Sequence, residues 1–280
     1  MKGIILAGGL GTRLHPLTSS LSKQLLPLFD KPMIYYPLST LIELGIRDIL
    51  LICKKDDLLL FKNLLKDGSQ WGIKISYEIQ KKPSGIAESF IIGKKFIGNN
   101  NVTLILGDNI FYGVKYNTKN FINGATIFAY QVQDPQRYGV IEIKNNYPIK
   151  IVEKPKNPKS NLAVTGLYVY DKEVVKIAEN INPSKRGELE ITDINNEYLR
   201  RKKLNVSVLK EGSMWLDAGT FSTLLQASLF IQTLQERQNI QIGSPESASF
   251  KQNFIKKNML KKILSRSPKN EYYNYLKKLT

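Results

Sequence analysis

The feature that most constrains the fold is a regular alternation of short apolar runs and amphipathic segments through the first hundred or so residues. Apolar runs of four to six residues predict strands, and apolar residues recurring every three or four positions predict helices. The expected strands are 2–7, 48–53, 73–79 and 102–106, and the expected helices are 33–44, 56–65 and, capped by Ser84, 87–96. This strand–helix order predicts a parallel, doubly wound sheet with right-handed crossovers.

The middle of the chain is richer in strands, and its end is helical. Strands are expected at 125–132, 139–144, 163–170 and 204–209, helices at 172–179, 190–200 and 221–238, and turns at Asp134–Pro135 and Tyr147–Pro148. The tail from 253 to 280 is expected to be helical with a break at Ser267–Pro268. The expected fold class is α/β, with a Rossmann-like, mixed but mostly parallel central sheet. The expected organisation is one domain over 1–280, with 221–280 as a C-terminal helical extension.

Single residues and charge exclude several classes of function. Cys53 and His15 are the only residues of their types, so an intrachain disulfide is excluded, and a zinc site or a Ser-His-Asp triad has little to draw on. Cys53 lies in an apolar run and is expected to be buried. The net charge is +17, and 33 of the 41 positive charges are lysines. A solvated lysine surface that attracts polyanionic substrates explains this charge, and no nucleic-acid-binding motif is recognised.

The distribution of apolar residues bears on location. No run of 18 or more apolar residues occurs, so no membrane span is expected. The apolar run at the N-terminus is too short for a signal peptide, and glycines follow it where a cleavage site would lie. A cytoplasmic protein is therefore expected.

A glycine-rich segment directly follows the first expected strand and reads GGLGTR over residues 8–13. Glycines let a backbone approach a ligand closely, and Arg13 adds a planar cation for phosphate oxygens. The P-loop pattern has no match, and the dinucleotide pattern fails because Leu14 stands where its third glycine is required. Asp30 lies at the distance of a ribose-binding acid, but a dehydrogenase is poorly supported. A turn that binds nothing stays open on this segment alone.

A series of further blocks follows in order along the chain. They read GGLGTRL at 8–14, SKQLLP at 22–27, DKPMIYYPL at 30–38, DGSQWG at 67–72, LGDNIFYG at 106–113, DPQRYGV at 134–140, EKP at 153–155, VTGLY at 164–168, RGELEITD at 186–193 and WLDAGT at 215–220. Together they resemble the sugar-nucleotide pyrophosphorylases, and among these the glucose-1-phosphate thymidylyltransferase family. One glycine motif is weak evidence, whereas this many ordered blocks over the whole chain are specific.

The resemblance implies a nucleotidyltransferase fold, a homotetramer, and the synthesis of dTDP-glucose and pyrophosphate from dTTP and glucose-1-phosphate with Mg²⁺. It assigns nucleotide binding to Gly8, Gly11, Thr12, Arg13, Lys23, Gln24, Gln80 and Gly85. It assigns the sugar-phosphate site to Tyr138, Gly139, Glu153, Lys154, Val164 and Trp215. Asp108 and Asp217 would bind Mg²⁺, and the catalytic set would be Arg13, Lys23, Lys154 and Asp108. Trp71 is expected in the core, whereas Trp215 is open between core and ligand.

The implied reaction agrees with the composition. The nucleophile is a sugar-phosphate oxygen that is already anionic, so neither a general base nor a covalent protein nucleophile is needed. Positioning and positive charge are the requirements, as in other phosphoryl transfers. Two carboxylates with phosphate oxygens and water suit Mg²⁺. Gln24 and Gln80 complement the edge of thymine, but uracil shows the same edge, so glutamines alone cannot select dTTP over UTP.

The sequence departs from the family pattern at several places. His15 replaces a common aromatic residue and is expected only to pack, and Glu88 stands where relatives often have glutamine, near the expected nucleotide site. Ala218 replaces a common threonine. The segment 114–123 is shorter than in relatives, where it contributes to subunit contacts and a second, inhibitory nucleotide site. The shortening predicts weakened feedback by dTDP-sugars.

Three alternatives stay open from the sequence. A sister enzyme that uses UTP would need a substrate panel to exclude it. A non-catalytic sugar-nucleotide-binding subunit would be favoured by loss of Arg13, Lys23, Asp108 or Asp217, and all four are present. A nucleic-acid-binding protein driven by the basic tail would give a salt-dependent gel shift.

Overall fold

The computed structural model describes residues 1–116, 121, 123–145 and 147–280. Half of the short segment 114–123, namely residues 117–120 and 122, therefore lies outside the described residues. The principal strands are β1 (Lys2–Ala7), β4 (Asp48–Cys53), β5 (Lys74–Ile79), β6 (Val102–Leu106), β7 (Asn109–Tyr112), β8 (Ala125–Gln131), β9 (Gly139–Lys144), β10 (Tyr147–Glu153), β11 (Leu162–Tyr170), β12 (Leu204–Val208) and β13 (Met214–Asp217), and a short ribbon is formed by β2 (Pro27–Leu28) and β3 (Lys31–Pro32). The helices are α1 (Tyr35–Glu43), α2 (Leu58–Leu65), α3 (Glu88–Ile92), α4 (Lys94–Ile97), α5 (Val174–Asn180), α6 (Ile191–Arg200), α7 (Phe221–Gln238), α8 (Pro245–Lys251), α9 (Lys257–Ser265) and α10 (Glu271–Lys277).

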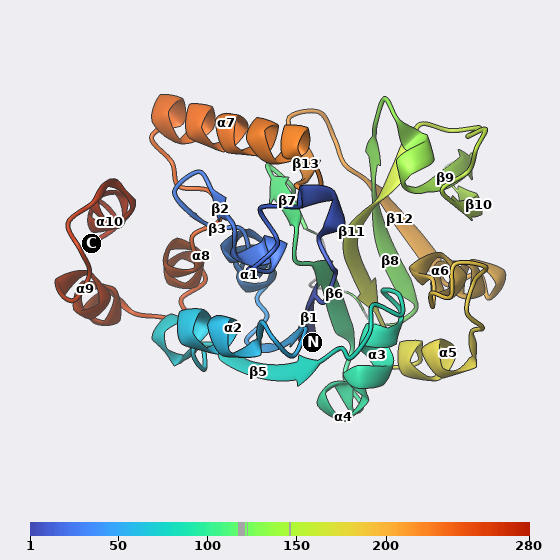
Figure 1. The fold of residues 1–280 in the computed structure, drawn as a ribbon, viewed down its shortest axis with the longest axis horizontal. Helices are drawn as coiled ribbons and strands as arrows, with labels where there is room; N and C mark the ends of the chain where they lie inside the picture. The colour runs from blue at the N-terminus through green and yellow to red at the C-terminus, as the bar shows by residue number, and fades with distance from the viewer. Residues whose placement is uncertain (117–120, 122, 146) are drawn as a thin grey trace.

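The central sheet has the strand order β10-β9-β11-β6-β1-β4-β5, and β8 pairs with both β11 and β12. The strands β6, β1, β4 and β5 are all parallel, whereas β11 runs antiparallel to β6 and begins a second, antiparallel half with β8, β9 and β10. Figure 1 shows β9 and β10 at one end of the molecule and α9 and α10 at the other. The expected fold class, a mixed α/β structure with a Rossmann-like core and a helical C-terminal segment, is confirmed.

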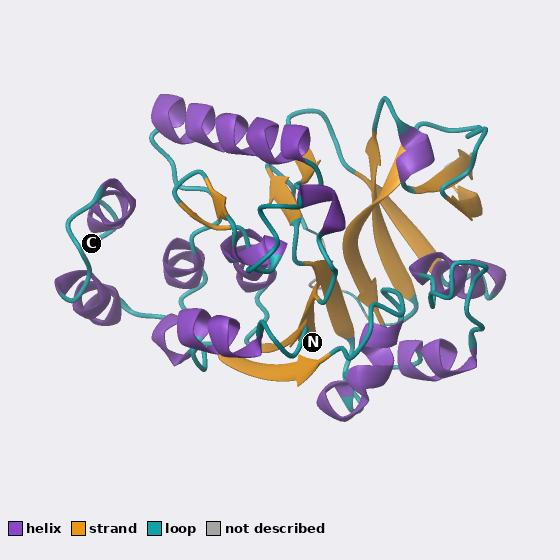
Figure 2. Ribbon diagram, viewed as in Figure 1, coloured by secondary structure: helices purple, strands orange, loops and turns teal. Residues whose placement is uncertain are grey.

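Helices cover both faces of the sheet, because successive side chains of a strand point to opposite faces (Figure 2). On β1, Ile4 packs in a cluster with residues of α3, α5 and α6, whereas Ile5 packs with residues of α1 and α2. Cys53 is buried in the second cluster, as expected. Trp71 is 3% exposed and meets the Tyr35 ring edge-on at 5.7 Å, so its assignment to the core is confirmed.

A third, smaller hydrophobic cluster attaches the C-terminal part of the chain. Ala227 and Ile231 of α7 pack against Ile110 of β7 and Ala218, which follows β13. Figure 1 shows α7 lying along the edge of the molecule near β7 and β13. The tail is helical on both sides of the predicted break, since α9 ends at Ser265 and α10 begins at Glu271. Among the described residues, no helix combines the length and apolarity that crossing a bilayer requires.

Two local expectations are wrong. The helix predicted at 87–96 is divided at Gly93 into α3 and α4, and Ser84 does not cap it, because Ala87 is the N-cap residue and the Ser84 carbonyl accepts a hydrogen bond from the Leu189 amide at 2.7 Å. Tyr147–Pro148 forms the start of β10 rather than a turn. Because β10 lies at the edge of the sheet, the missing N–H group of Pro148 costs no essential pairing.

Candidate active site

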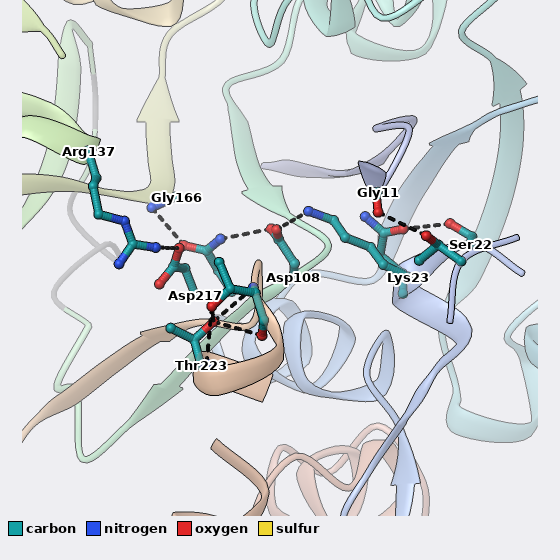
Figure 3. Close-up of polar contacts among 12 residues, drawn as sticks. Gly11, Ser22, Lys23, Asp108, Arg137, Gly166, Asp217 and Thr223 are labelled. Atoms are coloured by element: carbon teal, nitrogen blue, oxygen red, sulfur yellow. Dashed lines mark hydrogen bonds and ion pairs between the residues drawn. The ribbon is translucent and has the colours of Figure 1, made fainter. Parts of the chain in front are cut away.

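The glycine-rich segment 8–13, here called the phosphate loop after its predicted role, begins where β1 ends, at the carboxyl edge of the parallel strands. Gly11 has a φ of 67°, a left-handed conformation that favours glycine, and its carbonyl accepts a 2.9 Å hydrogen bond from the Thr18 hydroxyl (Figure 3). Thr12 and Arg13 follow in a short 3₁₀ turn. A Cβ atom placed on Gly219 would lie 3.1 Å from Nη2 of Arg13, so the guanidinium reaches the end of β13. The loop thus presents Arg13 to the segment that carries Asp217.

The two predicted metal-binding carboxylates lie on two segments of the chain that meet at this edge. Asp108 lies between β6 and β7, and Asp217 ends β13. The two segments are joined by a hydrogen bond from the Ala218 amide to the Asp108 carbonyl at 3.1 Å. Lys23 forms an ion pair with Asp108, whereas the Tyr138 hydroxyl donates to Oδ1 of Asp217 at 3.1 Å (Figure 3 shows Lys23, Asp108 and Asp217).

Burial acts on these two carboxylates with different results. Burial alone would raise the pKa of Asp108, but the Lys23 ammonium outweighs it and holds that pKa below its usual value. Burial raises the pKa of Asp217, and the nearby negative charge of Asp108 adds to this, while Arg137 offsets it only in part. Perturbed carboxylates in a cavity are typical of functional sites. The described residues contain no cluster of three or more metal-ligating side chains, so further oxygen ligands for a cation would come from substrate or water.

A cavity of about 500 Å³ opens beside the two carboxylates. Arg13, Asp108 and Asp217 line it, and all the residues predicted for the sugar-phosphate site line it too: Tyr138, Gly139, Glu153, Lys154, Val164 and Trp215. The structure therefore brings this predicted set together in one place, although the role of each residue stays a prediction. The Trp215 ring packs edge-on against Tyr138 at 5.1 Å and faces both core and cavity.

Polar contacts hold the predicted sugar-phosphate residues Glu153 and Lys154 in place. The Thr192 hydroxyl donates to Oε2 of Glu153 at 2.6 Å, and Arg186 lies 3.5 Å from the other carboxylate oxygen. The Lys154 amide donates to the Tyr138 carbonyl at 3.0 Å, and Lys154 has a φ of 42°, so its backbone turns sharply at the end of β10. The Lys154 side chain is exposed enough to reach into the cavity, and Glu153 is fixed as a hydrogen-bond acceptor.

The other predicted nucleotide residues lie outside the lining of this cavity, around the ends of β1 and β5. Gln24 and Gln80 are only 2% and 4% exposed. A Cβ atom on Gly8 would lie 2.1 Å from Oε1 of Gln80, and one on Gly85 would lie 2.3 Å from the Leu189 carbonyl oxygen. Both glycines are therefore required for close packing here.

Asn109 is a site residue that the sequence interpretation missed. Its side-chain amide donates to Oδ1 of Asp108 at 3.0 Å. Its Oδ1 accepts from the Gly166 amide at 3.0 Å and from the Trp215 indole nitrogen at 2.6 Å. This single buried side chain ties β7 to β11 and β13. The available signal was its position directly after Asp108 in a matched block.

Two further residues line the cavity without having been assigned a role. Arg137 contacts Asp217 at 3.5 Å, and Thr192 holds Glu153. Both lie within matched blocks, so attention to polar neighbours in those blocks would have found them. His15 is exposed beside the phosphate loop, and the expectation that it has no role in the reaction stays a prediction.

The chain matches the model of the nucleotidyl transferase family over residues 2–233. It is 51% identical to a glucose-1-phosphate thymidylyltransferase of Neisseria meningitidis over 100% of this chain and 99% of that relative. It is 49% identical to the enzyme of that name from Mycolicibacterium smegmatis over 100% and 99% of the two chains.

Solved structures give a consistent result. A Bacillus anthracis protein provisionally named a glucose-1-phosphate thymidylyltransferase, in complex with sucrose, is 40% identical with a TM-score of 0.78 over 88% of this chain and 99% of that one. A UDP-glucose pyrophosphorylase complexed with UDP-glucose has a TM-score of 0.72 over 83% and 98% of the two chains, but only 24% identity, so it supports the fold alone.

Proposed function

The chain belongs to the nucleotidyl transferase family, and from that premise we propose that it makes dTDP-glucose and pyrophosphate from dTTP and glucose-1-phosphate. The observation that carries this proposal is the single cavity in which the predicted sugar-phosphate residues meet Asp108, Asp217 and Arg13. The relatives named for this activity match the chain from end to end, which supports the same substrates.

The reaction is a direct displacement at the α-phosphorus of dTTP. An oxygen of the glucose-1-phosphate group forms a bond to that phosphorus, and the bond to the bridging oxygen of pyrophosphate breaks, so the electron pair leaves with pyrophosphate. The nucleophile is an anion near neutral pH and no proton needs to be removed. The task of the protein is to hold two anions together in line and to balance the charge that builds between them.

The cations of the site divide this task. Arg13 follows the glycine loop in a short turn, which suits a planar cation held against the triphosphate and the developing charge. Lys23 forms an ion pair with Asp108, and it would contact the same phosphates. Lys154 and Glu153 also line the cavity. There Lys154 would hold the phosphate of the incoming sugar, and Glu153 would accept hydrogen bonds from sugar hydroxyls.

We propose Mg²⁺ as the cofactor, held by Asp108 and Asp217. The donor chemistry fits, since two carboxylates line one cavity and substrate phosphates and water would complete an oxygen shell. When bound, the cation supplies charge neutralisation at the phosphates. The depressed pKa of Asp108 keeps that group ionised for this purpose, and Arg137 and Tyr138 hold Asp217 in position.

Three wider properties are proposed with the activity. The dTDP-glucose formed would enter dTDP-sugar biosynthesis, such as that of dTDP-rhamnose for polysaccharides. Its nucleotide substrate supports a cytoplasmic location, and the family resemblance supports a homotetramer. Size-exclusion chromatography with light scattering tests the last of these directly.

The deciding experiment measures pyrophosphate release with glucose-1-phosphate and Mg²⁺, comparing dTTP, UTP, CTP, ATP and GTP. We expect preference for dTTP, and at least a hundredfold loss of activity in Asp108→Asn, the order seen when a preorganised charge is removed. Asp134→Asn makes the same change at an exposed carboxylate near the site and is expected to leave activity close to that of the wild type.

Each other outcome has a definite meaning. Release with UTP alone would keep the chemistry but assign the protein to a uridylyltransferase. Absence of release with every nucleotide would contradict the proposal and favour a non-catalytic sugar-nucleotide-binding subunit.

A further inference from the structure

We propose that Glu88 is a positioning residue that sets base specificity. It fixes the side-chain amide of Gln80 so that the amide offers an oxygen, and not an NH₂ group, to the base. This inference rests on the proposed function and on the role that the family resemblance implies for Gln24 and Gln80, which is to read the base of the nucleotide. Glu88 itself contacts Gln80 and acts through it.

The contacts of Gln80 determine its orientation. Its Nε2 donates to Oε2 of Glu88 at 2.7 Å and to the Gly85 carbonyl at 3.3 Å. A carboxylate and a carbonyl can only accept hydrogen bonds. Rotating the amide by half a turn would place Oε1 against both acceptors. Gln80 is 4% exposed, so water could not relieve that repulsion.

The opposite end of the amide is left as an acceptor. Oε1 of Gln80 lies against Gly8, at the start of the phosphate loop. Within the described part of the chain it accepts no hydrogen bond, yet it is not among the fully buried side-chain atoms that lack a partner. A reachable acceptor at the carboxyl edge of a parallel sheet lies where ligands bind in such folds.

Gln24 is held in the complementary sense. The Ser22 hydroxyl donates to its Oε1 at 2.6 Å, and both residues are almost fully buried. Nε2 of Gln24 therefore stays available as a donor. A serine hydroxyl can also accept, so Ser22 permits either amide orientation, whereas Glu88 permits only one at Gln80.

This arrangement distinguishes pyrimidines by their hydrogen-bonding edges. Thymine and uracil present an N3–H donor and an O4 acceptor, which match one fixed oxygen and one NH₂ group. Cytosine presents an N3 acceptor and an N4 amino donor, which require both amides to be reversed. Reversal at Gln80 is opposed by the Glu88 carboxylate. A neutral glutamine at position 88 could both donate and accept, and would turn together with Gln80.

The test compares Glu88→Gln with the wild type, using kcat/KM for dTTP and for dCTP with glucose-1-phosphate and Mg²⁺. We expect the preference for dTTP over dCTP to fall about tenfold, the size of one hydrogen-bond mismatch in a buried site. The change should come from a lower KM for dCTP and a higher KM for dTTP, with kcat less affected. Equilibrium binding of each nucleotide, measured without the sugar, should show the same loss of discrimination.

Glu78→Gln is the matched control. It makes the same chemical change two residues before Gln80, on an exposed side chain of β5, and should keep the wild-type ratio. An unchanged dTTP-to-dCTP ratio in Glu88→Gln would overturn the inference, and so would an equal loss with both nucleotides, because that indicates a merely structural role. Should the wild type release no pyrophosphate, the proposed function fails, and the ratio of nucleotide affinities alone decides the role of Glu88.

Discussion

At the scale of single residues, the surroundings shift the pKa values of two carboxyl groups in opposite directions. Asp108 is held ionised by Lys23, while burial makes the ionised form of Asp217 unfavourable. A carboxyl whose pKa is raised by folding contributes stability below its usual pKa of about 4. That stability is lost as the pH rises through the folded-state pKa. At neutral pH the negative charge of Asp217 therefore lowers the stability of the fold, and the proposed metal binding requires that charge.

Replacing Asp217 by asparagine should separate stability from activity. We expect the free energy of unfolding at pH 7 to increase by about 1 kcal/mol, as when other functional strain is relieved, while pyrophosphate release is lost. The gain should shrink as the pH falls toward the usual carboxyl range, where wild-type Asp217 becomes neutral. Urea unfolding of both proteins across this pH range measures it. A lower free energy of unfolding for Asp217→Asn at pH 7 would contradict the argument.

The sequence identified some residues of the cavity and missed others, and the reasons are physical. The predicted sugar-phosphate residues lie in blocks that match the family, and the sheet brings them together because the ends of neighbouring strands meet at one edge. Asn109 escaped notice because its importance lies in tying three distant strands, which no local pattern reveals. The exposure of His15 was not visible in the sequence, because exposure on a loop depends on the course of the chain and not on residue type.

At the scale of elements, the junction of β13 and α7 controls the position of Asp217. Asp217 is the last residue of β13, and α7 begins at Phe221. Between them, Thr220 caps the helix by accepting a hydrogen bond from the Thr223 amide at 3.2 Å, and the Thr223 hydroxyl accepts from the Thr220 amide at 3.0 Å. This reciprocal cap satisfies two donors and fixes the angle at which the chain leaves the site.

Thr220→Ala removes the cap and should lower the free energy of unfolding by about 1 kcal/mol. It should also raise the KM for glucose-1-phosphate, because the end of β13 is less firmly held. Thr233→Ala is the control, since Thr233 is an exposed residue within α7 whose hydroxyl only contacts the Leu229 carbonyl of the preceding turn. Its effect should stay within about 0.5 kcal/mol. Equal destabilisation by the two substitutions in urea would show that the cap has no special role.

Elements were predicted well where a long apolar pattern specified them. The helix α7 and the strands β6 and β9 have the expected bounds, and α7 has Thr220 as its N-cap and Asn239 as its C-cap. The strands β7 and β13 are four residues each and pair only with each other, so their existence depends on a contact across a hundred residues of chain. The division of α3 from α4 arises at Gly93, where a Cβ atom would lie 3.0 Å from the Ile4 side chain. Such packing constraints cannot be recognised from the spacing of apolar residues in the sequence.

At the scale of the whole molecule, the net charge of +17 is a second cost to folding. Like charges on a compact chain repel one another, and salt screens them. The lysines are scattered along the sequence and are most concentrated in the tail from 251 to 280, so the repulsion is strongest there. The same surplus attracts polyanionic substrates over distances longer than any single contact.

Raising the ionic strength from about 0.01 M to about 0.15 M shortens the screening length from about 30 Å to about 8 Å. We expect Tm to rise by about 2 °C, the shift that about 1 kcal/mol gives in a chain of this size. Differential scanning fluorimetry in sodium chloride and in sodium acetate measures it. Equal rises would indicate screening, whereas a fall in Tm with either salt would contradict the idea that self-repulsion dominates.

The position of β11 has a consequence for inheritance. This strand is the border between the parallel and the antiparallel strands. On the parallel side the phosphate loop follows β1 and Gln80 follows β5, whereas on the antiparallel side Tyr138 precedes β9 and Glu153 ends β10. We therefore expect mutations on β9, β10 and α6 to change the part of the cavity lined by Gly139, Glu153 and Thr192 while leaving the parallel strands in place. In the course of evolution, such a protein could change its specificity for the sugar while its specificity for the nucleotide stays the same.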